Sequence, residues 1–80
     1  MNEILVILQE ECAEVIQSVS KIHRFGLTDE KKDHLQHELG DLQCMIDLCV
    51  ENDIVELDKI VSYKKDKREK LKLWSNINLI

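Results

Sequence analysis

The sequence contains no proline and only two glycines among its 80 residues. Proline removes a backbone donor and glycine loosens the backbone, so few positions in this chain interrupt a helix. We therefore expect long helices. A chain of this length supports one domain with a small core and a thin stability margin, so we also expect it to associate with further copies of itself.

The sequence also lacks an excess of basic residues. It carries 11 lysines and arginines against 16 acidic residues, which gives a net charge of −5. Because binding to the backbone of a long nucleic acid needs a basic face, we expect no such partner. A small anionic ligand stays open if a metal ion or a local basic cluster supplies positive charge.

Signals for a membrane or an oxidising compartment are missing as well. No apolar run approaches the roughly 20 residues of a membrane span, and residues 1–4 lack the features of a signal peptide. Cys12, Cys44 and Cys49 form no Cys-x-x-Cys pair, which argues against structural zinc and favours reduced, buried thiols. We expect a cytoplasmic protein without a membrane partner.

The spacing of the apolar residues predicts an all-α domain over residues 1–80, with helices at about 2–25, 29–51 and 53–74. The first apolar stripe consists of Ile4, Leu8, Val15, Val19 and Ile22. The second consists of Leu35, Leu39, Leu42, Met45, Ile46 and Cys49. The third consists of Leu57, Ile60, Val61 and Leu71.

Residues that begin and end helices stand between these stripes. Gly26 is suited to a helix C-terminus, and either Thr28 or Asp29 can cap the second helix. Asp53 and Glu56 have the spacing of a capping box, which predicts that the third helix begins at Asp53.

Four acidic residues fall on or beside the apolar faces. At about 100° per residue, Glu11 projects inside the apolar face of the first helix and Glu14 lies at its edge. Glu38 projects inside the face of the second helix, and Asp41 lies at its border. The sequence thus contains two i, i+3 acidic pairs that turn toward the interior of the bundle.

Carboxylates in a helix-packing face are costly unless a positive charge neutralises them. Carboxylate pairs on facing helices are one way to build a metal site in a bundle. Ligation by oxygen alone favours Mg²⁺ or Mn²⁺, and Mg²⁺ indicates phosphoryl chemistry. The alternative is that some of the 16 acidic residues reach a helix seam by chance, with Glu14 and Asp41 as partners of lysines.

Basic residues continue the apolar stripe of the third helix. Lys64 and Arg68, spaced i, i+4, would face the acids and contact the phosphates of a Mg²⁺–triphosphate. Lys21 and Arg24 are further candidates for phosphate binding. The alternatives are a solvated basic surface for the first pair and favourable charges at a helix C-terminus for the second.

Three further residues suggest other interpretations. His34 and His37 lie near Glu38 and would suggest a transition-metal site, but we expect His37 to point away and His34 to lie at the border. Trp74 either anchors helix packing or stacks on a base, and packing is the more common role.

The acidic pattern reads Glu10-Glu11-Cys12-Ala13-Glu14 and then Glu38-Leu39-Gly40-Asp41. It resembles the EExxE…ExxD signature of the MazG-like all-α nucleotide pyrophosphohydrolases. Residues 21–26, after the first motif, also resemble that family.

The resemblance implies a helical bundle that completes its core and active site as a homodimer or homotetramer. It implies cleavage of a nucleoside triphosphate, with ribose or deoxyribose, to the monophosphate and pyrophosphate. It implies Mg²⁺, or Mn²⁺ as a substitute, on Glu11, Glu14, Glu38 and Asp41. By the same resemblance Lys64 and Arg68 would hold phosphates.

Two aspects of the function stay open at the level of sequence. Either Glu10 or Glu14 would accept the proton of the attacking water. The competing function is a non-catalytic helical module that oligomerises or binds nucleotide. A purely structural module predicts apolar residues at the positions of Glu11 and Glu38.

Overall fold

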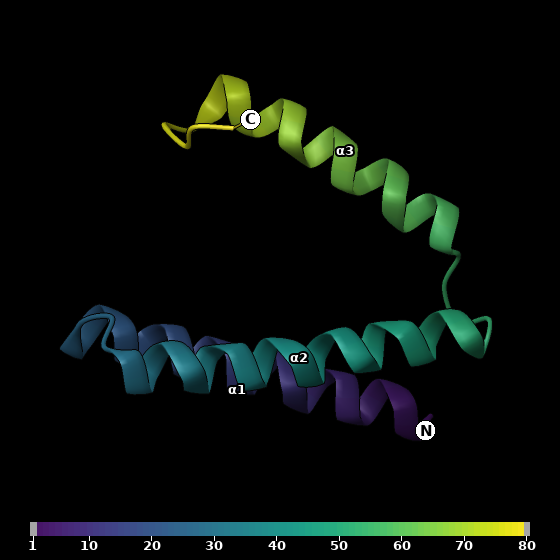
Figure 1. Cartoon of the computed structure of the whole chain (residues 1–80). Coiled ribbons are helices and arrows are strands. Elements are labelled where there is room, and N and C mark those ends of the chain that lie inside the picture. Colours follow the sequence, from purple (N-terminus) through teal and green to yellow (C-terminus); the bar gives the residue numbers. More distant parts are fainter. Residues whose placement is uncertain (1, 80) are drawn as a thin grey trace.

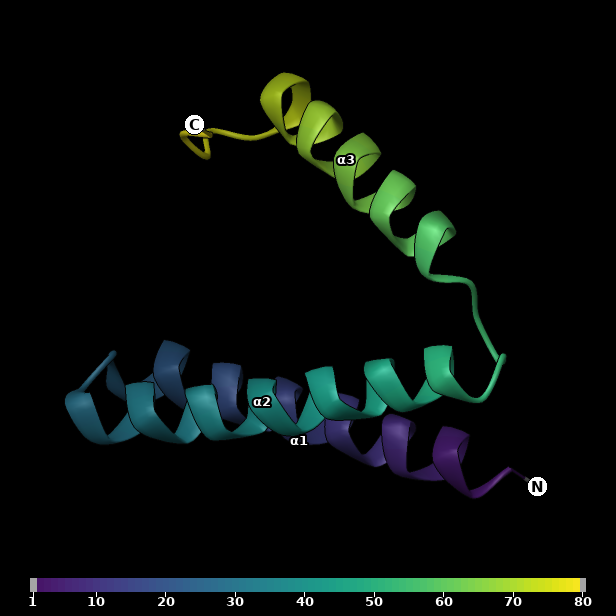
Figure 2. The same cartoon turned by 45° about the vertical axis from the view of Figure 1, so that its right-hand side comes forward.

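The computed structural model describes residues 2–79, and this range contains three α-helices and no strand. The helices are α1 (Glu3–Phe25), α2 (Asp29–Glu51) and α3 (Leu57–Trp74). α1 and α2 form an antiparallel hairpin, and α3 leads away from it at an angle (Figures 1 and 2). The predicted all-α fold is confirmed.

The turn between α1 and α2 forms as its residues predict. Gly26 ends α1 with φ 90°, a left-handed value that favours glycine, and its N–H donates to the carbonyl of Ile22 at 2.8 Å. Thr28 caps α2 because its hydroxyl accepts from the N–H of Lys31 at 3.3 Å. The structure thus selects Thr28 as the cap, and Asp29 is the first residue of the helix.

The third helix begins later than the capping-box pattern predicts, at Leu57 instead of Asp53. The side-chain amide of Asn52 donates to the carbonyl of Leu48 at 2.8 Å, and Asp53 then adopts a positive φ of 57°. That φ turns the chain out of a helical path, so residues 53–56 form the connection. Glu56 occupies the N-cap position, but within the described chain its side chain makes no capping hydrogen bond.

A seam of inward-facing residues holds the hairpin together. Positions spaced alternately by four and three residues, as in a coiled coil, are buried or half-buried on both helices. On α1 they are Ile4, Leu8, Glu11, Val15, Ser18 and Ile22. On α2 they are Lys31, Leu35, Glu38, Leu42, Met45 and Cys49. The third seam position of each helix is therefore a glutamate.

α3 packs little against the hairpin. A compact domain of this length has a radius of gyration of about 12 Å, whereas this chain has 14.9 Å. Apolar residues along α3 remain open to solvent: the exposed fractions are 58% for Leu57, 56% for Val61 and 83% for Trp74. The expected packing role of Trp74 is therefore not fulfilled within the described chain.

The cysteines only partly match the sequence prediction. All three are free thiols, but Cys12 and Cys44 are exposed and only Cys49 is buried. The prediction of buried thiols is wrong for the first two because they lie outside the four-and-three spacing of the seam. Within residues 2–79 no helix has the length and apolar character needed to cross a membrane.

Candidate metal centre between the first two helices

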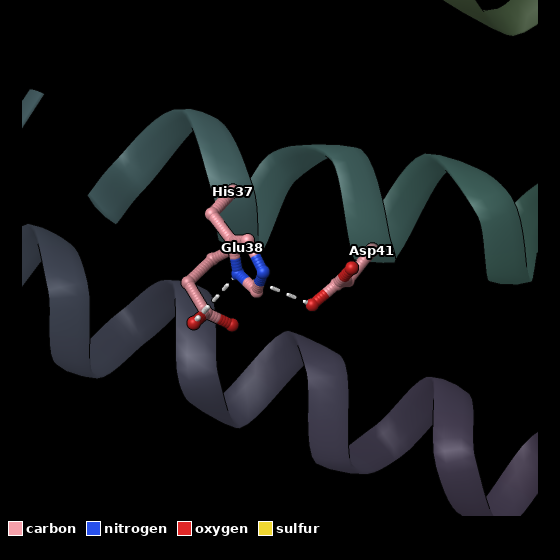
Figure 3. Close-up of side chains that lie close together, drawn as sticks. All are labelled: His37, Glu38 and Asp41. Carbon is pink, nitrogen blue, oxygen red and sulfur yellow. Dashed lines mark ion pairs between the residues drawn. The ribbon is translucent and has the colours of Figure 1, made fainter. Parts of the chain in front are cut away.

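Glu38 is the buried acid of the hairpin. The residue is 8% exposed, and its side chain extends from α2 toward α1 (Figure 3). Two imidazoles lie beside its carboxylate. Nε2 of His34, one turn earlier, is 3.6 Å from Oε1 of Glu38, and Nδ1 of His37 is 3.7 Å from the same oxygen.

Asp41 lies one turn beyond His37 on α2, and its side chain is 47% exposed. Its Oδ2 is 3.5 Å from Nδ1 of His37, so that the imidazole lies between the two carboxylates (Figure 3). One ligand atom from each of His37, Glu38 and Asp41 lies within 4.8 Å of the other two. α2 alone therefore presents a compact group of two carboxylates and one imidazole.

The position of His37 corrects a sequence prediction. We expected this side chain to point away from Glu38 and Asp41, but it contacts both. The signal was present in the sequence, because His37 and Asp41 are spaced i, i+4, and residues at this spacing are neighbours on a helix surface. His34 and Glu38 have the same spacing, and His34 does lie at the border, as predicted.

The other helix contributes Glu11, which is half-buried in the seam. Desolvation by burial raises the pKa of Glu11, and negative charges raise it further, in decreasing order those of Asp41, Glu38, Glu14 and Glu10. The carboxylates of the two sequence motifs thus act on one another across the seam. Glu10 and Glu14 are themselves exposed on α1.

These residues fit a divalent cation by the chemistry of their donor atoms. Carboxylate oxygens suit Mg²⁺ and Mn²⁺, and a bound cation would relieve the repulsion that acts on Glu11. Of the four predicted ligands, Glu38 and Asp41 belong to the compact group. Glu11 and Glu14 lie outside that group. The charges of Asp41 and Glu38 act on Glu11, and the charge of Glu14 acts on Glu11 from the same helix.

Lys64 of α3 does not face the acids within one chain. Lys64 lines a cleft of about 400 Å³ between α2 and α3, together with Gln43 and Asp47. An α-helix turns by about 100° per residue. By this rotation, the α2 residues that line the cleft, such as Gln43 and Asp47, lie on the side of the helix opposite to Glu38 and Asp41. Lys64 therefore does not lie across a single-chain bundle from the acids, as the sequence predicted, because α3 approaches α2 from its other side. The position of Arg68 relative to the acids stays a prediction.

The two basic residues of α1 lie toward its C-terminal end. Cζ of Arg24 lies 5.1 Å from the centroid of the Phe25 ring, and Nζ of Lys31 lies 5.5 Å from the same centroid. Lys21 is exposed on α1. The contact observed for Arg24 is thus with the aromatic ring beside the turn, and neither Lys21 nor Arg24 belongs to the compact acidic group.

Residues 1–70 match the family model for the MazG nucleotide pyrophosphohydrolase domain. The chain belongs to the MazG family. The match includes α1, α2 and most of α3, and it confirms the resemblance seen in the acidic motifs. Neither the curated proteins nor the solved structures gave a significant match to the chain.

Proposed function

We propose that this MazG-family chain hydrolyses nucleoside triphosphates to the monophosphate and pyrophosphate, with Mg²⁺ or Mn²⁺ as cofactor. The observation that carries the proposal is the burial of Glu38 in the helix seam, on the same helix as Asp41. The charges of Glu38 and Asp41 both act on Glu11 of the facing helix. A purely structural hairpin would gain more from an apolar residue at that seam position, because an unneutralised carboxylate is costly there.

The ligand set proposed for the cation is Glu11, Glu14, Glu38 and Asp41. When bound, the cation would neutralise phosphate oxygens and favour attack by water. Glu38 would provide a ligand from inside the seam, and His34, which lies beside its carboxylate, would restrict the orientation of that carboxylate. Glu10 or Glu14, both exposed on α1, accepts the proton of the attacking water.

Basic side chains would bind the triphosphate. Lys64 and Arg68 are both exposed on α3, one turn apart, and we assign them to the phosphates. Lys21 and Arg24 are further candidates on α1. Because Lys64 lies on the opposite side of α2 from Glu38, a Lys64 that acts at this site has to come from another copy of the chain.

The exposed surface area also favours a homodimer or homotetramer. A compact protein of 9.4 kDa exposes about 5000 Å² of surface, whereas this chain exposes 6860 Å². The excess of roughly 1900 Å² is more than the ~800 Å² that each partner buries in a typical stable interface. Apolar residues of α3, among them Leu57 and Val61, contribute to this excess.

The direct test is release of pyrophosphate from a panel of ribo- and deoxyribonucleoside triphosphates, with Mg²⁺ and with a chelator. We expect metal-dependent release with a monophosphate as the second product, and the panel would rank the bases and the sugars. A folded protein that binds the cation but turns over no member of the panel would indicate a binding module. A folded protein that does not bind the cation would refute the catalytic proposal.

A further inference from the structure

The compact group on α2 includes a nitrogen donor that the acidic motifs do not contain. Nδ1 of His37 lies 3.5 Å from Oδ2 of Asp41 and 3.7 Å from Oε1 of Glu38. In an octahedral site with ligand distances of about 2.1 Å, adjacent ligands lie ~3.0 Å apart and opposite ligands ~4.2 Å apart. The two distances from Nδ1 fall between these values, and all three donor atoms lie within 4.8 Å of one another, so small side-chain adjustments would place them around a single cation.

We propose that His37 is a nitrogen ligand of the metal centre and makes the site prefer Mn²⁺ to Mg²⁺. This inference rests on the proposed function, because it concerns the same cation site. Mg²⁺ takes oxygen ligands almost exclusively, whereas imidazole is a common ligand of transition metals. A set of two carboxylates and one imidazole therefore adds a donor that Mn²⁺ uses and Mg²⁺ does not.

The exposure of His37 suits this role. Its side chain is 72% exposed, so it reaches the site from the solvent side, while Glu38 extends into the seam (Figure 3). Because His37 packs little against the protein, substituting it should not disturb the fold. An effect of the substitution on metal binding would then report on ligation.

His34 provides a matched comparison on the same helix. Its Nε2 lies 3.6 Å from Oε1 of Glu38, but it is not among the three donors that lie within 4.8 Å of one another. We assign His34 to positioning the Glu38 carboxylate and His37 to ligation. The two imidazoles should therefore affect metal selectivity differently.

The experiment measures Mn²⁺ and Mg²⁺ affinities by calorimetry, without nucleotide, for the wild type and for His37→Gln, His34→Gln and Glu38→Gln. Pulsed electron paramagnetic resonance of the Mn²⁺ complexes records coupling to nitrogen. We expect His37→Gln to weaken Mn²⁺ binding at least ~10-fold, to change Mg²⁺ binding less than ~2-fold and to abolish the nitrogen coupling. We expect His34→Gln to retain that coupling.

Three results would contradict the role of His37, and one would contradict the metal site itself. Unchanged Mn²⁺ affinity in His37→Gln, an equal loss for both ions, or nitrogen coupling that survives in His37→Gln would overturn the role of His37. Unchanged binding of both ions in Glu38→Gln would instead refute the metal site on which the proposed function depends. Loss of binding in Glu38→Gln with wild-type selectivity in His37→Gln would leave the proposed function standing and reject only the inference about His37.

Discussion

Asp41 of α2 repels Glu11 of α1 more strongly than any other charged residue that acts on it. Burial contributes most to the raised pKa of Glu11, and the charge of Asp41 ranks second. The hairpin therefore holds like charges close together where its two helices pack. A cation with carboxylate ligands would convert this repulsion into attraction.

We predict that Glu11→Gln reduces the loss of stability of the metal-free protein with rising pH. The folded-state pKa of Glu11 lies above its ordinary value of 4.5. At pH values between 4.5 and the folded-state pKa, the folded chain therefore binds more protons than the unfolded chain. Stability conferred by protonated Glu11 is thus present at low pH and lost as the pH rises through the folded-state pKa. Thermal unfolding in chelator at pH 5 and pH 7.5 would measure the difference.

The matched control for this prediction is Glu10→Gln, which removes the same charge from an exposed neighbouring position. It should change the pH dependence less, because Glu10 is the weakest of the four acids that act on Glu11. An equal change in both variants would show that net charge, and not the seam, causes the effect.

A divalent cation should stabilise the folded chain. At a concentration about 100 times its dissociation constant, a ligand specific to the folded state adds about 2.7 kcal/mol. In a domain of this size that corresponds to a rise of roughly 10–20 °C in the unfolding midpoint. Scanning fluorimetry with Mn²⁺ and with chelator would detect it.

In Glu38→Gln, Mn²⁺ should raise the unfolding midpoint little or not at all. Glu30→Gln changes an exposed residue in the first turn of α2, and its unfolding midpoint should rise with Mn²⁺ as in the wild type. A full rise in Glu38→Gln would exclude this carboxylate as a ligand.

One inactive and one impaired variant should restore activity when they are mixed. Glu38→Gln should abolish turnover while the helices stay folded, and Lys64→Met should lower kcat/KM at least ~10-fold through lost phosphate contacts. If Lys64 acts on the acids of another chain, random exchange of subunits in a dimer produces one intact site in every mixed dimer. Refolding the two variants together would recover about a quarter of the wild-type activity.

The control is a mixture of Glu38→Gln with the double variant Glu38→Gln/Lys64→Met, which contains no intact acidic site in any combination. No recovery in the first mixture, with subunit exchange demonstrated independently, would place Lys64 outside a shared site.

The exposed apolar face of α3 should mediate association. Val61→Asp places a charge on this face, where Val61 is 56% exposed in the single chain. We expect dissociation to weaker assemblies or monomers, with an association constant at least ~10-fold lower, because a carboxylate buried in an interface is costly. Sedimentation velocity over a concentration series would measure it.

Ser62→Asp introduces the same charge at the next position, which is exposed and polar, and should leave the assembly intact. A wild-type chain that sediments as a monomer at all concentrations would contradict the proposed assembly.

The sequence by itself determined the parts of this protein that depend on local spacing. Helix periodicity located α1 and α2, and Gly26 and Thr28 predicted the turn between them. The same periodicity placed Glu11 and Glu38 among apolar residues, and the structure finds both in the seam. These predictions succeeded because side-chain direction along a helix follows from its pitch alone.

Only the tertiary structure decided which side of α2 the third helix approaches. The positive φ of Asp53 and the connection at residues 53–56 set the direction of α3, and no periodicity encodes that direction. Lys64 therefore lies behind α2 and not across from the acids. The contact of His37 with two carboxylates was also missed, because the reach of an imidazole across one helical turn depends on its rotamer and not only on its angular position.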